Sequence, residues 1–470
     1  MNPKFLEILR FAYLLTVQYL KRKWRMLLGI FLLGCALLFL LFKLSLINLY
    51  ANSISLGLVG TYQEHDLPSE VSNLMSHGLI SWDSSGRAKP NIALGWETNN
   101  DATSFKFKLK KDLVWSDGTN LSSEDLEFNI PNTEITYPYQ STINFKLKEP
   151  YSPFSSLLIK PIFKKGTLTG LGPYSIKSVE KSRIFITKMI LTTPKQDLPE
   201  VIIRFYPNEK TAMSGFELGE VQVLLGVNQR LTQTSTSPVK FLQKTDYGKI
   251  VTILFSTKDK MLSHKYLRQA LSFAAPKAAG EKEAKNSIQP WSWASSEPVK
   301  NYLSNPDQAK TALERLKNQN GSPDLSLPIT LTSTPQLENV AQNIVSSWKN
   351  LGLNVLTRIE SGIPQNFQVL LITQSIPIDP DQYFLWHSTQ TRTNLTGYSF
   401  ARVDKDLEDG RKIINEAERK EKYLDFQKEL LEDAPATFLY FPKYNVLYLK
   451  KAEDMLNKIL PLQLPGPVYQ

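Results

Sequence analysis

The sequence predicts an α/β protein with at least two folded lobes, and three observations support this prediction. Residues 325–373 alternate between strand-like and helix-like patterns of apolar residues. Aromatic residues make up 11% of the chain, which is enough to build hydrophobic cores. Most of the 470 residues follow one apolar segment near the N-terminus, and a folded region of that size exceeds a single hydrophobic core.

The first element is that apolar segment, Met26 to Phe42, which contains no charged or polar side chain. As a helix it would be roughly 26 Å long, close to the hydrocarbon thickness of a bilayer. It follows the basic cluster Lys21 to Arg25, whereas Lys and Arg are missing between positions 44 and 86. We therefore expect residues 1–25 to be cytoplasmic or interfacial, residues 26–48 to form a single transmembrane anchor in the cell membrane, and the C-terminal remainder to lie outside.

A cleaved signal peptide is the alternative explanation of this segment, because its core is also apolar and flanked by basic residues. The apolar core here starts only at Met26, and no small-x-small cleavage site closes it before Lys43, which favours a retained anchor. The single cysteine, Cys35, ends a loose version of the lipoprotein processing box. Apolar residues continue from Ala36 to Phe42, so a membrane-buried thiol is favoured and lipidation is the alternative.

The charge and cysteine content narrow the class of protein. The net charge is +10, but the 55 Lys and Arg residues are scattered among 45 Asp and Glu residues, apart from the cluster beside the apolar segment. A solvated surface explains this pattern, and we expect no nucleic acid partner. With one cysteine, an intramolecular disulfide and a thiolate metal site are both excluded.

A strand, a turn and a cap are recognisable in the first half of the exported chain. Phe105 to Leu109 alternates apolar and polar residues, as a half-buried strand does, and Ser116-Asp117-Gly118 follows as a turn. Ser122-Ser123-Glu124-Asp125 has the pattern of a capping box that opens a helix. We expect the next strand at Ser141 to Leu147.

The second half contains a strand-helix-strand unit. Leu325 to Thr332 is strand-like, and apolar residues between Leu337 and Leu351 recur on one helix face. Gly352 is placed to end this helix. The strands Leu353 to Ile359 and Phe367 to Thr373 complete the unit.

One helix and one strand are expected after this unit. Val403 to Leu431 has the pattern of a long amphipathic helix that ends before Pro435. Ala436 to Leu447 is aromatic and strand-like.

Seven blocks of sequence resemble, in the same order, motifs of the family 5 extracellular solute-binding proteins, the oligopeptide and dipeptide receptors of ABC importers. The blocks are Asn91 to Trp96; Phe105 to Leu109 with Val114 to Leu126; Gly170 to Tyr174; Ser214 to Val221; Tyr266 to Ser272; Asn305 to Lys310; and Asp379-Pro380 with Asn394 and Gly397-Tyr398. The resemblance covers almost the whole exported chain. It implies a two-lobe, periplasmic-binding-protein-like (type II) fold with a hinge.

The resemblance also implies how the chain divides between the lobes. Lobe I is expected at 52–250, with a trimmed subdomain at about 86–165 and a returning segment at 439–470, and lobe II at 251–438. A solute would bind in the cleft between the lobes, and lobe closure would signal to an ABC import permease.

The resemblance implies which residues contact the ligand. In peptide-binding relatives an Asp holds the terminal amine of the peptide, and this chain has Ile376 there. The predicted ligand contacts are Asp379, Asp381, Tyr383 and Trp386 of lobe II and Glu64 and Asp66 of lobe I. Two alternatives stay open, because an Asp after a strand is often a cap and a Trp is often a core residue.

Two further tryptophans, Trp291 and Trp293, lie in a loop that contains Pro and Ser. They would reach the cleft or a partner, or pack onto lobe II.

Three functions remain open at this point. The leading one is a membrane-tethered receptor for peptides or related solutes, without a cofactor, a metal or catalytic residues. The second is a surface interaction or scaffold protein with a degenerate binding fold. A hydrolase with an unrecognised carboxylate pair is third, because zinc-protease, serine-hydrolase and P-loop motifs are missing. His65 and His387, with Asp66, would be the candidate metal ligands, but scattered histidines are more often surface or core residues.

Overall fold

The computed structural model describes residues 23–24, 31–39, 52–228, 238–297, 299–464 and 468. The chain forms two compact units, Met1–Ile54 and Ser55–Gln470. In the first unit, residues 31–39 are helical, and the rest of the predicted anchor at 26–48 lies outside the described residues. Within the described part of the chain, no helix has the length and apolar character needed to cross a bilayer. The anchor therefore stays a prediction.

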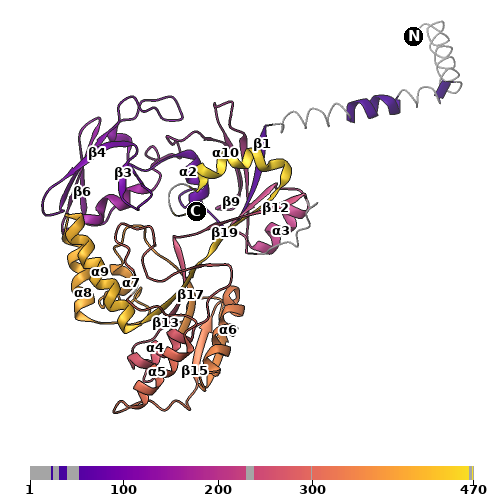
Figure 1. Ribbon diagram of the computed structural model, residues 1–470. Helices are drawn as coiled ribbons and strands as arrows, with labels where there is room; N and C mark the ends of the chain where they lie inside the picture. Colours follow the sequence, from indigo (N-terminus) through magenta and orange to yellow (C-terminus); the bar gives the residue numbers. More distant parts are fainter. Residues whose placement is uncertain are drawn as a thin grey trace, which may run out of the picture. The chain divides into compact units, whose positions relative to one another are not determined.

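The second unit contains a seven-stranded sheet in the order β12-β19-β11-β1-β10-β9-β8 (Figure 1). The strand bounds are β1 Ser53–Val59, β8 Ser175–Ser182, β9 Phe185–Thr192, β10 Glu200–Tyr206, β11 Val223–Leu225, β12 Val239–Thr245 and β19 Lys443–Leu449. Strands β1 and β11 run parallel, with Leu56 opposite Val223, and β19 runs antiparallel to β11 and β12. The returning C-terminal strand thus completes this sheet, which we call the sheet of lobe I.

Three helices accompany the sheet of lobe I. They are α2 Ser69–Met75, α3 Glu209–Glu217 and α10 Glu453–Gln463, the last preceded by the 3-10 turn η4 Lys450–Ala452. Helix α3 packs Met213 and Phe216 onto Leu224 and Leu447 of the sheet. Asn73 of α2 donates a hydrogen bond to the carbonyl oxygen of Gln463 at 3.1 Å, which ties α2 to the end of α10.

A smaller subdomain is inserted between β1 and β8. Its four-stranded sheet has the order β4-β5-β7-β6, and β2 and β3 form a separate hairpin. The bounds are β2 Ile80–Trp82, β3 Ala88–Pro90, β4 Ala93–Thr98, β5 Ser104–Leu109, β6 Thr133–Tyr139, β7 Thr142–Leu147, and the 3-10 helices η1 Ser123–Asp125 and η2 Ser152–Ile159. The strand predicted at Phe105 to Leu109 is confirmed, and its Phe105 and Phe107 side chains enter an aromatic core with Phe145 and Phe154.

The sheet of lobe II has six strands in the order β14-β18-β13-β17-β15-β16 (Figure 1). Its elements are β13 Lys249–Phe255, α4 Lys265–Ala274, β14 Lys282–Glu283, α5 Pro306–Lys317, β15 Ile329–Ser333, η3 Pro335–Leu337, α6 Glu338–Lys349, β16 Val355–Ile359, β17 Val369–Ser375, α7 Tyr383–Trp386, α8 Ala401–Lys412, α9 Glu416–Asp433 and β18 Ala436–Phe441. The predicted strand-helix-strand unit is confirmed as β15-α6-β16 with parallel strands. Gly352 follows α6 with φ +83°, which suits the predicted helix end.

The predicted single helix from Val403 to Leu431 is wrong, because α8 ends at Lys412 and α9 begins at Glu416. Asn415 separates the two helices. Its side chain accepts hydrogen bonds from the backbone N–H groups of Ala417 and Glu418 at 3.0 and 3.2 Å and so caps α9. The helical spacing of apolar residues continues across the break, which is why the pattern hides it.

The two sheets are connected at two described crossovers. The first leads from β12 to β13 through Asp246, Tyr247 and Gly248, and the second leads from β18 to β19 through Pro442. The backbone N–H of Asp246 donates to the carbonyl oxygen of Pro442 at 2.8 Å, so the crossovers lie side by side. This pair of crossovers has the position expected of a hinge, and we call it the hinge.

Candidate functional site

The candidate site begins where β17 ends, at Ile376. This residue is 7% exposed and belongs to the core of lobe II. Its backbone N–H donates to the carbonyl oxygen of Gly248 at 2.9 Å, which joins the end of β17 to the hinge. Ile376, which stands where the resemblance leads one to expect an acid, is therefore a buried hydrophobic residue beside the hinge.

Asp379 follows Ile376 and is paired with Arg419 of α9. The two guanidinium nitrogens Nη1 and Nη2 donate to its two carboxylate oxygens at 3.2 and 2.6 Å. Both side chains are nearly buried. Arg419 also donates to the carbonyl oxygen of Gly410 and to the Tyr423 hydroxyl, at 2.8 and 3.0 Å. Burial lowers the pKa of Arg419, but the Asp379 carboxylate and the Tyr423 hydroxyl together outweigh burial, so the net pKa lies well above its ordinary value.

Asp381 is paired in a similar way with Arg411, in the last turn of α8. Its Oδ2 atom lies 3.1 Å from Nε of Arg411. The Nε–H is not aligned for a hydrogen bond, so the contact is an ion pair. Burial raises the pKa of Asp381, and the Arg411 guanidinium opposes this effect. The two predicted ligand-contacting acids of lobe II, Asp379 and Asp381, are thus each neutralised by an arginine of the chain.

The same acids also hold the local backbone. Oδ1 of Asp379 accepts a hydrogen bond from the backbone N–H of Asp381 at 3.0 Å, and Oδ1 of Asp381 accepts one from Tyr383 at 3.2 Å. The second contact lies at the start of the short helix α7. Each bond joins a carboxylate to the backbone two residues further on, as in an Asx turn, while the N-cap residue of α7, Gln382, has no side-chain cap.

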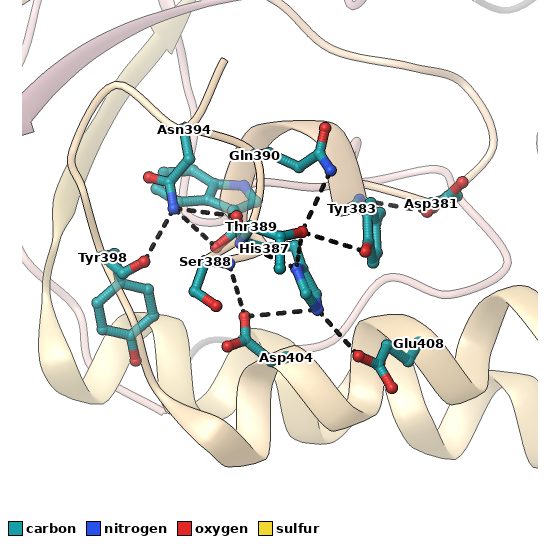
Figure 2. Close-up of polar contacts among 11 residues, drawn as sticks. Asp381, Tyr383, His387, Ser388, Thr389, Gln390, Asn394, Tyr398, Asp404 and Glu408 are labelled. Atoms are coloured by element: carbon teal, nitrogen blue, oxygen red, sulfur yellow. Dashed lines mark hydrogen bonds and ion pairs between the residues drawn. The ribbon is translucent and has the colours of Figure 1, made fainter. Parts of the chain in front are cut away.

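Tyr383 is stacked between a cation and a histidine. The guanidinium carbon of Arg411 lies 4.3 Å from the Tyr383 ring centre, and the ring of His387 is stacked on Tyr383 at 4.0 Å. The Tyr383 hydroxyl lies 3.3 Å from Oγ1 of Thr389 (Figure 2). Tyr383 is thus fixed on lobe II and stays a predicted ligand contact.

The ring nitrogens of His387 have different partners. Nδ1 accepts a hydrogen bond from the backbone N–H of Thr389 at 3.2 Å and lies 2.8 Å from Oγ1 of the same residue. Nε2 points to Oε1 of Glu408 at 3.2 Å, with Asp404 at 3.9 Å (Figure 2). Among the described residues, no group of three or more His, Cys, Asp or Glu side chains has the arrangement of a metal site.

Trp386 is placed in the core of lobe II. Its side chain is 2% exposed and packs edge-on against Phe438, and its Nε1–H donates to Oε1 of Gln382 at 2.9 Å. Asn394 fixes the loop that follows by donating to the carbonyl oxygens of Trp386, His387 and Tyr398 (Figure 2). The core alternative thus describes Trp386, and the Asn394 motif has a structural reason.

Glu64 and Asp66 lie in the loop after β1 in lobe I. Oε1 of Glu64 is 2.9 Å from Nζ of Lys181 in β8, and both side chains are partly exposed. Asp66 is exposed, and its backbone N–H donates to Gln63. The described partners of these residues belong to lobe I. Their role as ligand contacts stays a prediction.

Lobe I meets the paired acids through residues that the sequence analysis missed. Tyr151, at the start of η2, lies over Arg411, with 4.8 Å between its ring centre and the guanidinium carbon. Burial raises the pKa of Tyr151, and Asp381 and Asp379 raise it further. Ser152 donates to the carbonyl oxygen of Gly410 at 3.3 Å. Arg411 therefore touches aromatic rings from both lobes.

The hairpin tip 83–87 is a second contact between the lobes, where Ser85 accepts a hydrogen bond from the N–H of Trp293 and Arg87 pairs with Glu416. The turn-forming sequence Asp83-Ser84-Ser85-Gly86 signals a hairpin, but no local pattern shows what its tip touches.

Trp291 and Trp293 are in the loop that this tip covers. Trp293 is buried beside Tyr423, and Arg419 lies over its ring at 5.4 Å. Trp291 is partly buried and packs near Tyr247 of the hinge.

A hollow of about 880 Å³ lies elsewhere, in the subdomain between residues 127–131 and 156–167. Its lining includes none of the paired acids and arginines. We place the candidate site at the seam of the lobes, where ion pairs and aromatic rings converge.

Comparison with known proteins identifies relatives along most of the chain. The family model described as bacterial extracellular solute-binding proteins, family 5 Middle, matches residues 87–394. The oligopeptide-binding protein AppA of Bacillus subtilis is 22% identical over 459 residues, covering 81% of this chain and 83% of that protein. The dipeptide-binding protein of Escherichia coli is 21% identical over 433 residues, covering 74% and 80%.

Solved structures show the same fold. NikZ from Campylobacter jejuni, solved in complex with Ni(L-His), matches with a TM-score of 0.65 and 20% identity, covering 85% of this chain and 94% of that one. This similarity shows a two-lobe, periplasmic-binding-protein-like α/β fold. The relatives are binding proteins and not enzymes, as the sequence motifs predicted.

Proposed function

Since this chain belongs to the bacterial extracellular solute-binding proteins of family 5, we propose that it is a membrane-anchored receptor that binds a solute between its lobes and delivers it to an ABC import permease. The observation that carries this proposal is the hinge. Two sheets are joined by two adjacent crossovers, and the backbone bond from Asp246 to Pro442 holds the crossovers together. Such a connection lets the lobes open and close around a ligand while each sheet stays intact.

The paired acids bear on how this receptor recognises the charge of its ligand. A ligand ammonium needs an unpaired carboxylate, but Arg419 and Arg411 already neutralise Asp379 and Asp381. The buried Ile376 offers no charge. We therefore propose a peptide or related solute that is recognised without an ion pair between its terminal amine and these acids.

The range of ligands among the relatives leaves the ligand class open to experiment. Their names include an oligopeptide-binding and a dipeptide-binding protein, and NikZ was solved with a nickel–histidine complex. Peptides and metal chelates are therefore the two ligand groups to compare.

Ligand-dependent thermal stabilisation of the full-length chain in detergent tests the proposal. The three arms are a pool of free-amine peptides, the same pool after N-acetylation, and nickel with histidine. We expect both peptide pools to stabilise the protein to a similar degree, because the proposed recognition does not use the terminal amine. A ligand at a hundred times its Kd raises the free energy of unfolding by about 2.7 kcal/mol. Stabilisation in no arm would overturn the receptor and favour the scaffold function. Stabilisation by the free-amine pool alone would overturn recognition without the amine.

The membrane anchor rests on the apolar run Met26 to Phe42 and on the basic cluster before it. We propose that a single helix there holds the receptor outside the membrane, near its permease, where tethering raises the local concentration. Protease added to intact cells from which any outer barrier has been removed should digest the chain after residue 52 and leave the N-terminus protected. A chain released in soluble form would contradict the anchor.

A further inference from the structure

The tip of the β2–β3 hairpin, Asp83 to Arg87, has a rigid shape that its own side chains impose. Oδ1 of Asp83 accepts hydrogen bonds from the N–H of Ser85, the hydroxyl of Ser85 and the N–H of Arg87, at 2.8, 2.8 and 2.9 Å. Gly86 has φ +74°, a conformation that favours glycine. The hairpin tip therefore meets its surroundings as a preformed surface.

This tip, which belongs to lobe I, is seated on lobe II by two backbone features. The carbonyl oxygen of Ser85 accepts a hydrogen bond from the N–H of Trp293 at 2.9 Å. At Gly86 the fit is tight, because an added Cβ would lie 2.8 Å from Cζ3 of Trp291 and 3.3 Å from Cγ2 of Ile378. Only a residue without a side chain allows this approach.

Arg87 completes the contact with a two-pronged ion pair. Its Nε donates to Oε2 of Glu416 and its Nη2 donates to Oε1, both at 2.8 Å. Its Nη1 donates to Oγ of Ser85 at 2.6 Å. Glu416 is the first residue of α9, where a helix favours negative charge. The guanidinium is thus oriented from its own lobe before it reaches the other.

A second contact of the same kind lies nearby in the fold. Tyr151 covers Arg411 and Ser152 donates to Gly410, so the subdomain touches α8 as well as the start of α9. Both contacts join lobe I directly to lobe II. Their residues are far in sequence from the hinge residues 246–248 and 442. They favour the arrangement in which the lobes touch, whatever the solute.

We propose that the hairpin tip is a latch, and that Gly86 and the Arg87–Glu416 pair are positioning residues that set solute affinity through the population of the closed state. This inference rests on the proposed receptor function. A solute that binds the closed state has an apparent Kd equal to its intrinsic Kd divided by the closed fraction. Residues that never touch the solute can therefore change its affinity.

The two parts of the latch should differ in strength. The Arg87 and Glu416 side chains are 45% and 49% exposed, and an exposed pair of this kind shifts an equilibrium by up to about fivefold. A side chain at Gly86 would collide with Trp291 and prevent seating, so its effect should be larger. We expect a loss of about tenfold or more in solute affinity, by analogy with the cost of overpacked contacts.

Gly86→Val is the decisive variant, and Gly118→Val is its matched control. Gly118 lies in a turn of the same subdomain with φ +86°, and an added Cβ there would meet no atom within 4 Å. Both variants carry the same kind of backbone strain, but only Gly86→Val blocks contact between the lobes. Thermal unfolding of each variant reports whether strain alone changes the fold.

The readout is the distance between the lobes in the full-length chain. Spin labels on Lys111→Cys and Lys317→Cys, two exposed positions in different lobes, would be compared in a Cys35→Ala background. We expect Gly86→Val to lengthen and broaden the label distances without added solute, and Gly118→Val to leave them unchanged. Unchanged distances in Gly86→Val would overturn the latch. This readout needs no identified solute, so a failed ligand screen would overturn the receptor and leave the latch test intact.

The ion pair is tested by exchanging its charges. Arg87→Glu should lengthen the label distances, and the double variant Arg87→Glu, Glu416→Arg should restore them. The matched control exchanges Arg402 and Asp425, an exposed pair at 2.8 Å within lobe II, and should leave the distances unchanged. If the double variant stayed as open as Arg87→Glu, the pair would have no part in the latch.

Discussion

Arg419 donates hydrogen bonds to both carboxylate oxygens of Asp379, at 3.2 and 2.6 Å, so a cation from α9 neutralises an acid that follows the end of β17. A peptide ammonium would have to displace this guanidinium to reach Asp379. The arginine is held by three further contacts, to Gly410, Tyr423 and the Trp293 ring, which makes displacement costly. The pair is therefore expected to act on stability more than on ligand affinity.

Arg419→Met should destabilise the protein by about 3–5 kcal/mol, because it leaves the Asp379 carboxylate nearly buried without its partner. Chemical denaturation of the purified full-length chain measures this loss. The matched change Arg402→Met, at a half-exposed guanidinium that pairs with Asp425 and Glu429, should cost no more than about 1 kcal/mol per pair. The double variant Arg419→Met, Asp379→Asn should recover much of the loss, since it removes the unpaired charge. Equal losses in the two single variants would contradict this account.

The local pattern of apolar residues was sufficient to predict elements whose structure depends on residues close in sequence. The β15-α6-β16 unit follows from apolar spacing, and Gly352 ends its helix in the predicted place. The same reasoning failed at Asn415, where one capping side chain interrupts a pattern that otherwise continues. Ala436 to Leu447 has the pattern of one strand, but Pro442 divides it between two sheets. The spacing of apolar residues does not show to which sheet a strand belongs.

The candidate site was harder to predict because its partners meet only in the fold. Asp379 and Asp381 could be identified as polar residues after a strand, but Arg419 and Arg411 come from the helices α9 and α8. Nothing in their sequence neighbourhood marks them as partners. The hairpin tip is likewise an ordinary turn until lobe II is placed against it. Only the resemblance to a family indicated where along the chain to look.

Gly172→Ala should destabilise the protein by about 1–3 kcal/mol through a steric clash. An added Cβ would lie 2.6 Å from the carbonyl oxygen of Leu74, and the N–H of Gly172 donates to Met75 at 2.7 Å. Gly172 belongs to a block that resembles the family motif, so this contact gives the motif a packing reason. Gly95→Ala controls for the loss of glycine, because Gly95, like Gly172, has no positive φ and an added Cβ there would meet no atom within 4 Å. Chemical denaturation measures both, and a larger loss at Gly95 would contradict the packing argument.

Asp246 should make stability fall as pH rises above the ordinary pKa of an aspartate. Burial raises its pKa, Lys249 opposes this effect, and Glu70 adds to it. Between the ordinary and the raised pKa the folded state binds more protons than the unfolded state, so stability decreases with rising pH across that window. Asp246→Asn should remove this decrease and keep the hydrogen bond that Oδ1 accepts from Gly248.

The melting temperatures of the wild type and of Asp246→Asn between pH 2 and 7 measure this difference. Asp324→Asn is the control of opposite sign, because a hydrogen bond from Ser326 lowers the pKa of Asp324. Its stabilising contribution is present above the unfolded pKa and is lost as pH falls through the folded pKa. If Asp246→Asn followed the wild-type pH profile, the buried carboxylate at the hinge would not titrate as we infer.

Ile376→Asp should make peptide binding depend on a free terminal amine. The new carboxylate would be nearly buried beside the hinge, since Ile376 is 7% exposed. An unpaired buried charge destabilises the closed state, and a ligand ammonium would restore the balance by pairing with it. Titrations with free and N-acetylated forms of one peptide would show a preference for the free amine, whereas wild type would not distinguish them. Ile376→Asn adds polarity without charge and should show no such preference, so a preference shared by both variants would rule out charge pairing.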